Sequence, residues 1–363
     1  MKITIIAGAR PNFIKIAPII DAITDKNINY RLVHTGQHYD RNMSESFFQQ
    51  LGIPEPHANL ECGGGTQAEQ TANIMVRFET ELINNPVDLV IVVGDVTSTM
   101  ACAIVAKKLN TKVAHVEAGI RSGDITMPEE INRIVTDSIT DLFFTTSIKA
   151  GENLLKSGVE AHRIFFVGNT MIDTLLKNKE KFVRPAIWDQ LGLTKKSYLI
   201  LTLHRPANVD GEYQLKNLLE EIVSCSRGLP IIFPVHPRTA KKLEAIGFSS
   251  PNMHLTDPLS YLEFNYLVSN SKCVITDSGG ITEETTVMKV PCITLRNSTE
   301  RPETVETGTN ELIGTDPRAI KPYMDILFAE QWKKGGIPEL WDGKTAGRIA
   351  DHLLNSRDFI CGK

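Results

Sequence analysis

The chain has 363 residues, of which 42% are hydrophobic, so it is long and apolar enough for about two domains with full cores. Its 43 acidic and 39 basic residues give a net charge of −4, and no extended basic block offsets it, so we expect no nucleic-acid partner. No apolar run reaches the ~20 residues that span a bilayer, and the N-terminus lacks the cleavage pattern of a signal peptide.

These features predict a cytoplasmic protein without a membrane contact. The six cysteines are scattered along the chain and form no C-x-x-C pair. This pattern is typical of a reducing compartment and predicts neither a disulfide framework nor a zinc site.

Short apolar runs alternate with helical patterns throughout the chain. Continuous runs of Ile and Val suit strands that are covered on both faces, and helices between such strands make βαβ units. The fold class is therefore α/β, with two Rossmann-like doubly wound domains that face each other across a cleft. The predicted strands are Lys2–Ala7, Tyr30–His34, Asp88–Val93, Lys112–Val116, Leu142–Thr145, Tyr198–Leu203, Ile231–Val235, Cys273–Thr276 and Ile293–Leu295.

The strand rhythm breaks near residues 175–190, where a charged stretch ends in the sequence FVRP. We interpret this stretch as a linker between a first domain over residues 1–175 and a second domain over residues 186–344. The last segment, residues 345–363, contains a helix at Thr345–Asn355 that is expected to pack back on the first domain. Ligands of such sheets bind beyond the carboxyl ends of the strands.

Residues 8–15, GARPNFIK, follow the first strand. They do not match G-x-G-x-x-G, so the dinucleotide fingerprint is missing and no NAD or other cofactor is expected. Arg10 and Lys15 flank the start of a helix and could clamp a diphosphate, although surface solvation is an alternative. Residues 36–40, GQHYD, follow the second strand and could contact a substrate or an effector, or form a plain polar loop.

Carboxylates follow two strands and open the next helix. Asp95 and Glu117 come at strand ends, and Glu129 and Glu130 follow Pro128 at a helix start. The two glutamates point about 100° apart, so only one is expected to face the cleft. Crowded carboxylates raise one another's pKa, which suits general acid–base chemistry. A cap role for Asp95 and a metal site are alternatives, but no histidine lies at ligand spacing and we expect no metal.

Histidines follow two strands of the second half. His204 comes after the strand that ends at Leu203, and His236 comes after the strand that ends at Val235, each beside an arginine. Each histidine could bond a phosphate or a hydroxyl. Nearby, Tyr261 could stack on a base or belong to the core, as could Phe264.

Residues 277–284, DSGGITEE, continue the strand Cys273–Thr276 through a glycine turn into a helix. Free backbone N–H groups and the helix dipole make such a turn an anion site, and Gly279 and Gly280 let the backbone approach a phosphate. Glu284 lies about one turn into the helix and could accept hydrogen bonds from ribose hydroxyls. The alternative is an ordinary helix start capped by Ser278.

Eight motifs occur in order over nearly the whole chain: residues 8–15 (GARPNFIK), 35–38 (TGQH), 94–95 (GD), 115–119 (HVEAG), 128–133 (PEEINR), 203–205 (LHR), 277–280 (DSGG) and 299–303 (TERPE). In this combination the chain resembles the non-hydrolysing bacterial UDP-N-acetylglucosamine 2-epimerases. The resemblance implies a GT-B-like pair of Rossmann domains, a UDP-sugar bound mainly by the second domain, a homodimer and a role in polysaccharide biosynthesis.

The resemblance also assigns site residues. It implies catalytic roles for Asp95, Glu117, Glu129 and His204. It implies substrate binding by Arg10, Lys15, Ser278, Gly279, Gly280, Glu284 and Arg301. The chain departs from the family after His204-Arg205, where it has Pro206-Ala207-Asn208 and many members have a Glu-Asn sequence. It departs again at residues 39–42, and this second difference leaves open whether the substrate is also an allosteric activator.

The reaction implied is the interconversion of UDP-N-acetylglucosamine and UDP-N-acetylmannosamine. Anti elimination of UDP gives 2-acetamidoglucal, and re-addition of UDP after protonation on the other face inverts C2. The residues leave open a hydrolysing 2-epimerase that releases N-acetylmannosamine and UDP, and a 2-epimerase of a related UDP-2-acetamido sugar. A GT-B glycosyltransferase and a nucleotide-sugar sensor without catalysis are the remaining alternatives.

Overall fold

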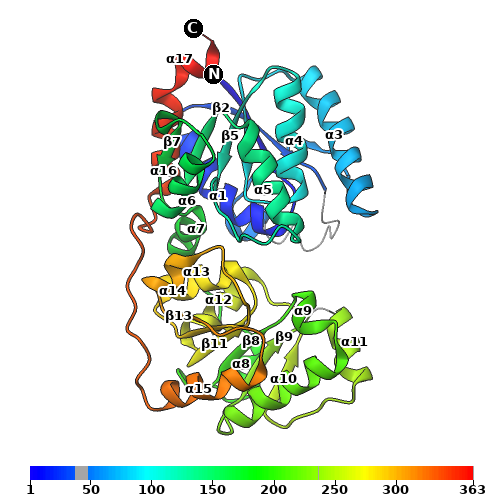
Figure 1. Ribbon diagram of the computed structural model, residues 1–363, viewed down its shortest axis with the longest axis vertical. Coiled ribbons are helices and arrows are strands. Elements are labelled where there is room, and N and C mark those ends of the chain that lie inside the picture. The colour runs from blue at the N-terminus through cyan, green and yellow to red at the C-terminus, as the bar shows by residue number, and fades with distance from the viewer. Residues whose placement is uncertain (37–47, 236, 363) are drawn as a thin grey trace. The chain divides into compact units, whose positions relative to one another are not determined.

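The computed structural model describes residues 1–36, 48–235 and 237–362 (Figure 1). Three predicted features lie outside the described residues: the GQHYD loop from residue 37 onward, residues 39–42, and His236. The side chain of Arg10 lies outside the description as well. The chain divides into two compact units, the first formed by Met1–Lys177 with Glu339–Lys363 and the second by Asn178–Pro338.

The first unit is built on a parallel seven-stranded sheet with the order β3-β2-β1-β4-β5-β6-β7. The order reverses beside β1, so the sheet is doubly wound, and its central strands are continuous buried apolar runs. The strands are β1 (Lys2–Ala7), β2 (Asn29–His34), β3 (Ala58–Asn59), β4 (Leu89–Val93), β5 (Lys112–Val116), β6 (Leu142–Thr145) and β7 (Ile164–Phe166).

Helices connect these strands and cover the sheet. They are α1 (Arg10–Asp25), α3 (Gln67–Asn84), α4 (Thr97–Lys108), α5 (Pro128–Ile139), α6 (Ile148–Lys156), η1 (Ala161–Arg163), α7 (Thr170–Asn178), α16 (Thr345–Asn355) and α17 (Arg357–Cys361). The last long helix, α16, packs beside α1 (Figure 1). Asp173 accepts hydrogen bonds from the first backbone N–H groups of α16, at 3.1 Å from Thr345 and 2.7 Å from Ala346, which caps this helix on the first unit.

The second unit has a parallel six-stranded sheet with the order β10-β9-β8-β11-β12-β13. The strands are β8 (Leu199–Thr202), β9 (Ile231–Pro234), β10 (Met253–Thr256), β11 (Cys273–Thr276), β12 (Cys292–Thr294) and β13 (Asn310–Leu312). Its helices are η2 (Lys179–Lys181), α8 (Ala186–Gln190), α9 (Pro206–Val209), α10 (Glu212–Cys225), α11 (Pro237–Ala245), α12 (Tyr261–Asn270), α13 (Gly279–Met288), α14 (Pro302–Glu306), η3 (Pro317–Ala319) and α15 (Ile320–Phe328).

The nine predicted strands are all present, and their ends agree to within two residues. The sequence patterns missed four strands, which are β3, β7, β10 and β13. These four are the edge strands of the two sheets. They are two to four residues long and only partly buried, so they lack the continuous apolar run that marks a central strand.

Each unit has its own hydrophobic core on both faces of its sheet. In the second unit, one cluster forms around Leu199, Leu219 and Ile275, and another forms around Tyr198, Ile200 and Val274. Among the described residues, no helix is long and apolar enough to cross a membrane.

Candidate functional site

The loop after β1 is held against the end of β4 by one asparagine. Asn12 Oδ1 accepts hydrogen bonds from the backbone N–H groups of Gly8 and Ala9, at 3.2 and 3.0 Å, and its Nδ2 donates to Val93 O at 2.8 Å. Asn12 is buried, so these bonds form in a low-dielectric environment where they are strong. They bring the start of α1 to the carboxyl edge of the sheet.

At this edge, Lys15 forms a buried ion pair with Glu117. The side chain of Lys15 therefore contacts a predicted catalytic carboxylate of its own chain. Glu117 has φ +70°, in the left-handed region that is rare for residues with a Cβ. A Cβ on Gly94 would lie 3.2 Å from Lys15 Nζ and 3.3 Å from Glu117 Oε2, so the glycine allows the β4 turn to approach the pair closely.

Asp95, the residue after Gly94, is held by α5. Its Oδ2 accepts two hydrogen bonds from Arg133, at 3.0 Å from Nε and 2.7 Å from Nη2. Its backbone oxygen accepts a hydrogen bond from Asn132 Nδ2 at 2.8 Å. A fork of this kind fixes the orientation of the carboxylate as well as its charge. Within the described residues, Asp95 Oδ1 makes no hydrogen bond.

The structure gives Glu129 and Glu130 different contacts. Glu130 is buried, lies 2.5 Å from Arg133 Nη1, and accepts the backbone N–H groups of Ser122 and Gly123 at 3.0 and 3.1 Å. Burial raises the pKa of Glu130, but these hydrogen bonds outweigh it and leave the pKa below its ordinary value. The partly exposed Glu129 makes no hydrogen bond or ion pair with any described residue.

Glu129 lies four residues before Arg133 on α5, so both lie on one helix face. Since Arg133 contacts Asp95, this face points to the same sheet edge. Glu130 holds the loop that precedes α5 and also pairs with Arg133. That only one of the two glutamates faces the site stays a prediction.

In the second unit, a buried aspartate organises the turn after β8. Asp277 accepts hydrogen bonds from the backbone N–H groups of His204 and Arg205, from Asn208 Nδ2 at 3.0 Å, and from His204 Nδ1 at 2.7 Å. Burial raises the pKa of Asp277, but its bonds to His204 and Asn208 prevail and lower it. The His204 side chain is 61% exposed, so its ring is oriented by Asp277 and remains open to a ligand.

The predicted anion site is the start of α13. Ser278 occupies the N-cap position, but its side chain makes no capping hydrogen bond, so it does not satisfy the first N–H groups of the helix. The nearest atom to a Cβ on Gly279 would be Arg296 Nη1, at 3.9 Å. The turn therefore has room for a ligand beside Arg296, and the N–H groups at a helix start can bind an anion.

Two arginines near this turn are paired within the chain. Arg296 makes a bidentate pair with Glu300, with both N–O distances at 2.7 Å. Arg301, implied by the resemblance to line the substrate cleft, is buried and forms an ion pair with Glu283. The structure thus gives Arg301 a carboxylate partner from its own unit.

Glu284, the predicted ribose acceptor, is buried in α13. Its Oε1 accepts a hydrogen bond from Tyr261 Oη at 2.8 Å and a longer one from Asn265 Nδ2 at 3.5 Å. Burial raises the pKa of Glu284 to about 7, although the two hydrogen bonds lower it. Tyr261 is buried with its hydroxyl on Glu284, and Phe264 packs on an apolar core cluster, so both belong to the core, as the alternative to base stacking proposed.

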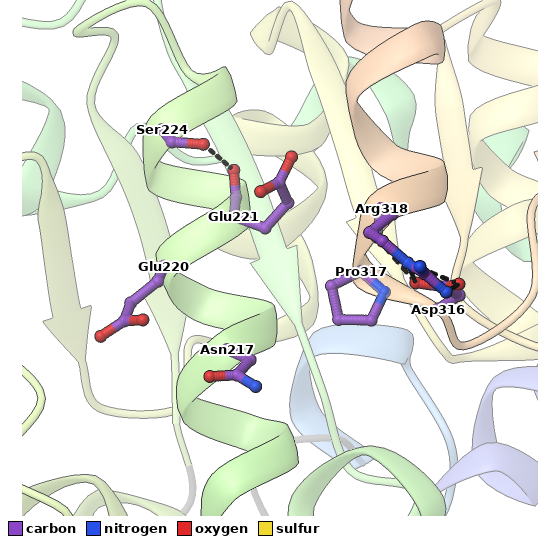
Figure 2. Close-up of a pocket in the computed structure, with 7 residues that line it drawn as sticks. All are labelled: Asn217, Glu220, Glu221, Ser224, Asp316, Pro317 and Arg318. Carbon is purple, nitrogen blue, oxygen red and sulfur yellow. Dashed lines mark hydrogen bonds and ion pairs between the residues drawn. The ribbon is translucent and has the colours of Figure 1, made fainter.

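Figure 2 shows a surface hollow of about 490 Å³ in the second unit, lined by α10 and the start of η3. Asp316 and Arg318 pair with each other on one side of it, and Glu220 and Glu221 project from α10 on the other. None of the predicted site residues lines this hollow. Within residues 1–36, 48–235 and 237–362, no group of three or more His, Cys, Asp or Glu side chains could hold a metal ion.

The sequence patterns did not identify the residues that orient the site. Arg133, Asn132, Asn12 and Asp277 all occur in motifs quoted above, but their partners are distant in sequence. For Asn12 and Asp277, a polar residue close to a glycine turn was the signal available, because a buried polar residue has to find hydrogen-bond partners.

The two doubly wound units and the carboxylates at a strand edge define an enzyme of the nucleotide-sugar class. The model of the UDP-N-acetylglucosamine 2-epimerase family matches residues 21–354. The chain belongs to this family.

Known relatives cover nearly the whole chain. The UDP-N-acetylglucosamine 2-epimerase of Methanocaldococcus jannaschii is 42% identical over 361 residues, with 96% of this chain and 98% of the relative covered. A UDP-2,3-diacetamido-2,3-dideoxy-D-glucuronate 2-epimerase of Pseudomonas aeruginosa is 39% identical over 97% of this chain and 99% of its own.

Among solved structures, the M. jannaschii enzyme in complex with UDP-GlcNAc and UDP matches with a TM-score of 0.88. The two chains are 41% identical, and the match covers 98% of this chain and 100% of the other. The predicted family and the α/β fold with two Rossmann-like domains are thereby confirmed.

Proposed function

We propose that this enzyme interconverts UDP-N-acetylglucosamine and UDP-N-acetylmannosamine by inverting C2 of the sugar, without hydrolysis of the bond to UDP. The family match and the names of the relatives support this substrate. The observation that carries the proposal is the carboxylate edge of the first sheet, where Asp95 is paired with Arg133 and Glu117 is paired with Lys15. Glu129 lies at the same edge and has no cation partner among the residues that the structure describes.

This arrangement suits an elimination followed by an addition. The C1–O bond breaks with its electron pair leaving on UDP, and the positive character at C1 makes the C2 proton acidic enough for a carboxylate to accept. The product is 2-acetamidoglucal, with a double bond between C1 and C2. Protonation of C2 on the other face and attack of UDP oxygen on C1 complete the inversion. No electrons are gained or lost overall, so the step needs no redox cofactor.

The first unit supplies groups for the proton transfers. Asp95 is oriented by Arg133 through its Oδ2 atom. Neither Asp95 Oδ1 nor the Glu129 carboxylate is hydrogen-bonded to a described residue. The Lys15–Glu117 pair adds a carboxylate and an ammonium in direct contact. Inversion needs two groups on opposite faces of the sugar, and we assign them to two of the three carboxylates at this edge.

The second unit supplies groups for UDP. The open turn Ser278–Gly280 offers backbone N–H groups to a diphosphate, which develops charge as the C1–O bond breaks. His204, held by Asp277, can donate to the same phosphates, and Glu284 can accept from the ribose hydroxyls. Binding roles for Arg10, Lys15, His236 and Arg301 remain predictions.

Proton NMR of the purified protein with UDP-N-acetylglucosamine in D2O, without added NAD or metal, tests the proposal. We expect a mixture of two UDP-sugars with deuterium at C2. Free N-acetylmannosamine and UDP as the only products would assign the chain to hydrolysing 2-epimerases. An unchanged substrate without deuterium would refute this activity.

A second candidate substrate is a UDP-2,3-diacetamido uronate. The 39% identity to the P. aeruginosa enzyme of that name over nearly the full chain favours including it. The same D2O experiment with that sugar, compared at equal concentration, discriminates the two. A higher kcat/KM for the UDP-uronate than for UDP-N-acetylglucosamine would make the uronate the substrate of this enzyme.

We also propose a cytoplasmic homodimer that serves polysaccharide biosynthesis. Helices α3, α4 and α5 pack in that order (Figure 1). The outer helices of this layer expose Val76 and Ile83 on α3, and Ile131 and Ile134 on α5, as interacting surfaces commonly do. Light scattering after gel filtration is expected to give twice the chain mass, and Ile134→Glu is expected to weaken the dimer. A monomer at all concentrations for the unaltered chain would exclude it.

A further inference from the structure

A buried histidine and aspartate connect two of the loops that carry carboxylates. His115, on β5, has no solvent exposure. Its Nδ1 lies 2.7 Å from Asp137 Oδ1 on α5, and its Nε2 lies 2.8 Å from the backbone oxygen of Gly94. The reaction described above uses neither His115 nor Asp137.

Both neighbours of the imidazole ring are hydrogen-bond acceptors. The oxygen of Gly94 can only accept, and an ionised Asp137 can only accept, so both ring nitrogens have to donate. A ring that donates from both nitrogens is an imidazolium. Burial raises the pKa of Asp137, but hydrogen bonding and charge from His115, together with Arg121, lower it overall, which agrees with an ionised partner.

The pair is part of a larger set of contacts. The second oxygen of Asp137 accepts a hydrogen bond from the backbone N–H of Gly119 at 3.1 Å and lies 2.6 Å from Arg121 Nη1. No other charged side chain is hydrogen-bonded or ion-paired to this pair within the described residues. Gly94 immediately precedes Asp95, and Gly119 lies two residues after Glu117. The pair therefore holds the backbone beside both carboxylates.

Two further features restrict the positions of the turns at Gly94 and Gly119. Gly119 has φ +78°, and a Cβ there would lie 2.2 Å from Ala150 O, so this turn has little room to move. Gly94 N donates to Val116 O at 3.0 Å. Displacement of Gly94 would move the turn that lies against the Lys15–Glu117 pair.

We infer that the doubly protonated His115, paired with Asp137, is a positioning unit for the epimerisation that sets the separation of Asp95 and Glu117. It does not touch the sugar and transfers no proton in the reaction. The inference rests on the proposed function. Because geometry errors of about 1 Å at reacting groups can cost roughly a hundredfold in rate, loss of the pair should act on turnover more than on binding.

Steady-state kinetics of His115→Gln and Asp137→Asn test this role. We expect kcat to fall roughly ten- to a hundredfold, with KM for the UDP-sugar and Kd for UDP within about twofold of the unaltered enzyme. The matched control is Asp141→Asn. Asp141 is buried, accepts the Val113 backbone N–H at 2.8 Å, and pairs with Lys107, but it lies at the opposite end of β5.

Asp141→Asn should lower stability by a similar amount and leave kcat within about twofold. Equal losses of kcat in the control and in the two test variants would overturn the inference, because the loss would then follow general destabilisation. An unchanged kcat in His115→Gln would overturn it as well.

Nitrogen-15 NMR of the histidine-labelled enzyme tests the protonation state without turnover. The signals that disappear in His115→Gln identify the ring among the nine histidines. We expect both nitrogens to carry a proton in the folded enzyme, because each faces a hydrogen-bond acceptor. A singly protonated ring would overturn the inference. If both variants fail to fold, the His115 signals are assigned from their contacts with Asp137, and the same result would overturn the inference. Lack of epimerisation by the unaltered enzyme would instead refute the proposed function.

Discussion

Replacing Glu284 with glutamine tests the nucleotide part of the proposal. Burial raises the pKa of Glu284 from 4.5 to about 7, and the hydrogen bonds from Tyr261 and Asn265 only partly oppose it. An ionised carboxylate is an acceptor for both ribose hydroxyls, whereas the protonated acid is a weaker partner. Affinity for UDP is therefore expected to fall as the pH falls through 7.

The size of the effect follows from the titration. With a pKa of about 7, roughly half of Glu284 is ionised at pH 7 and about a tenth at pH 6. The apparent Kd for UDP should thus rise about twofold at pH 7 and about tenfold at pH 6, relative to pH 8.5. Tyr261→Phe removes a bond that lowers the pKa, so the same fall should begin at higher pH.

Stability without UDP should change in the opposite direction. The folded-state pKa is above the unfolded one, so the contribution of Glu284 to stability is fully present below pH ~4.5 and is lost as the pH rises through 7. A rise from 4.5 to about 7 corresponds to about 3 kcal/mol. Glu284→Gln should therefore gain stability relative to the unaltered chain between pH 5 and 8.

Isothermal titration calorimetry with UDP at pH 6, 7 and 8.5, with urea unfolding at the same pH values, measures both effects. Glu284→Gln is also the control, because it keeps the titration of the UDP phosphates and of every other side chain. At pH 8.5 this variant should bind UDP more weakly than the unaltered protein does. Its affinity should not show the further decrease toward pH 6 that protonation of Glu284 causes in the unaltered protein. Parallel pH profiles for the two proteins would refute the assignment of Glu284 to the ribose.

Four further substitutions separate catalysis from structure. Glu129→Gln should lower kcat at least a hundredfold with an unchanged melting temperature. Glu130→Gln should cost about 3 kcal/mol of unfolding free energy, because it leaves the buried Arg133 guanidinium without one of its carboxylate partners. Stopped assays and urea unfolding distinguish the two variants, and equal stabilities would contradict this division. Asp277→Asn should weaken UDP binding and destabilise the fold at pH 7. This destabilisation should shrink as the pH falls below 3.8, since the pKa of Asp277 is lowered and its stabilisation is lost as the pH falls through that pKa; a destabilisation that does not change with pH would count against it. Gly119→Ala should cost about 2 kcal/mol or more, because the new Cβ would lie 2.2 Å from Ala150 O at φ +78°, and thermal unfolding checks this.

Central strands could be predicted from the sequence because burial on both faces leaves a continuous apolar run. The runs at Lys2–Ala7, Lys112–Val116 and Cys273–Thr276 agree with β1, β5 and β11 residue for residue. Edge strands such as Asn310–Leu312 have one exposed side and few residues, so polar positions interrupt the pattern. Their pairing depends on a neighbouring strand rather than on their own sequence.

The sequence alone defined the local chemistry of this protein: carboxylates at strand ends, a glycine turn at a helix start, and no dinucleotide fingerprint. These are short-range patterns, which the backbone rules of strands, turns and helix termini make readable. The identity of the partners was a different matter. Arg133 reaches Asp95 across 38 positions, and Lys15 reaches Glu117 across 102. Only the order of the strands in the sheet brings such residues together, so the tertiary structure decided which cation each of these carboxylates is paired with.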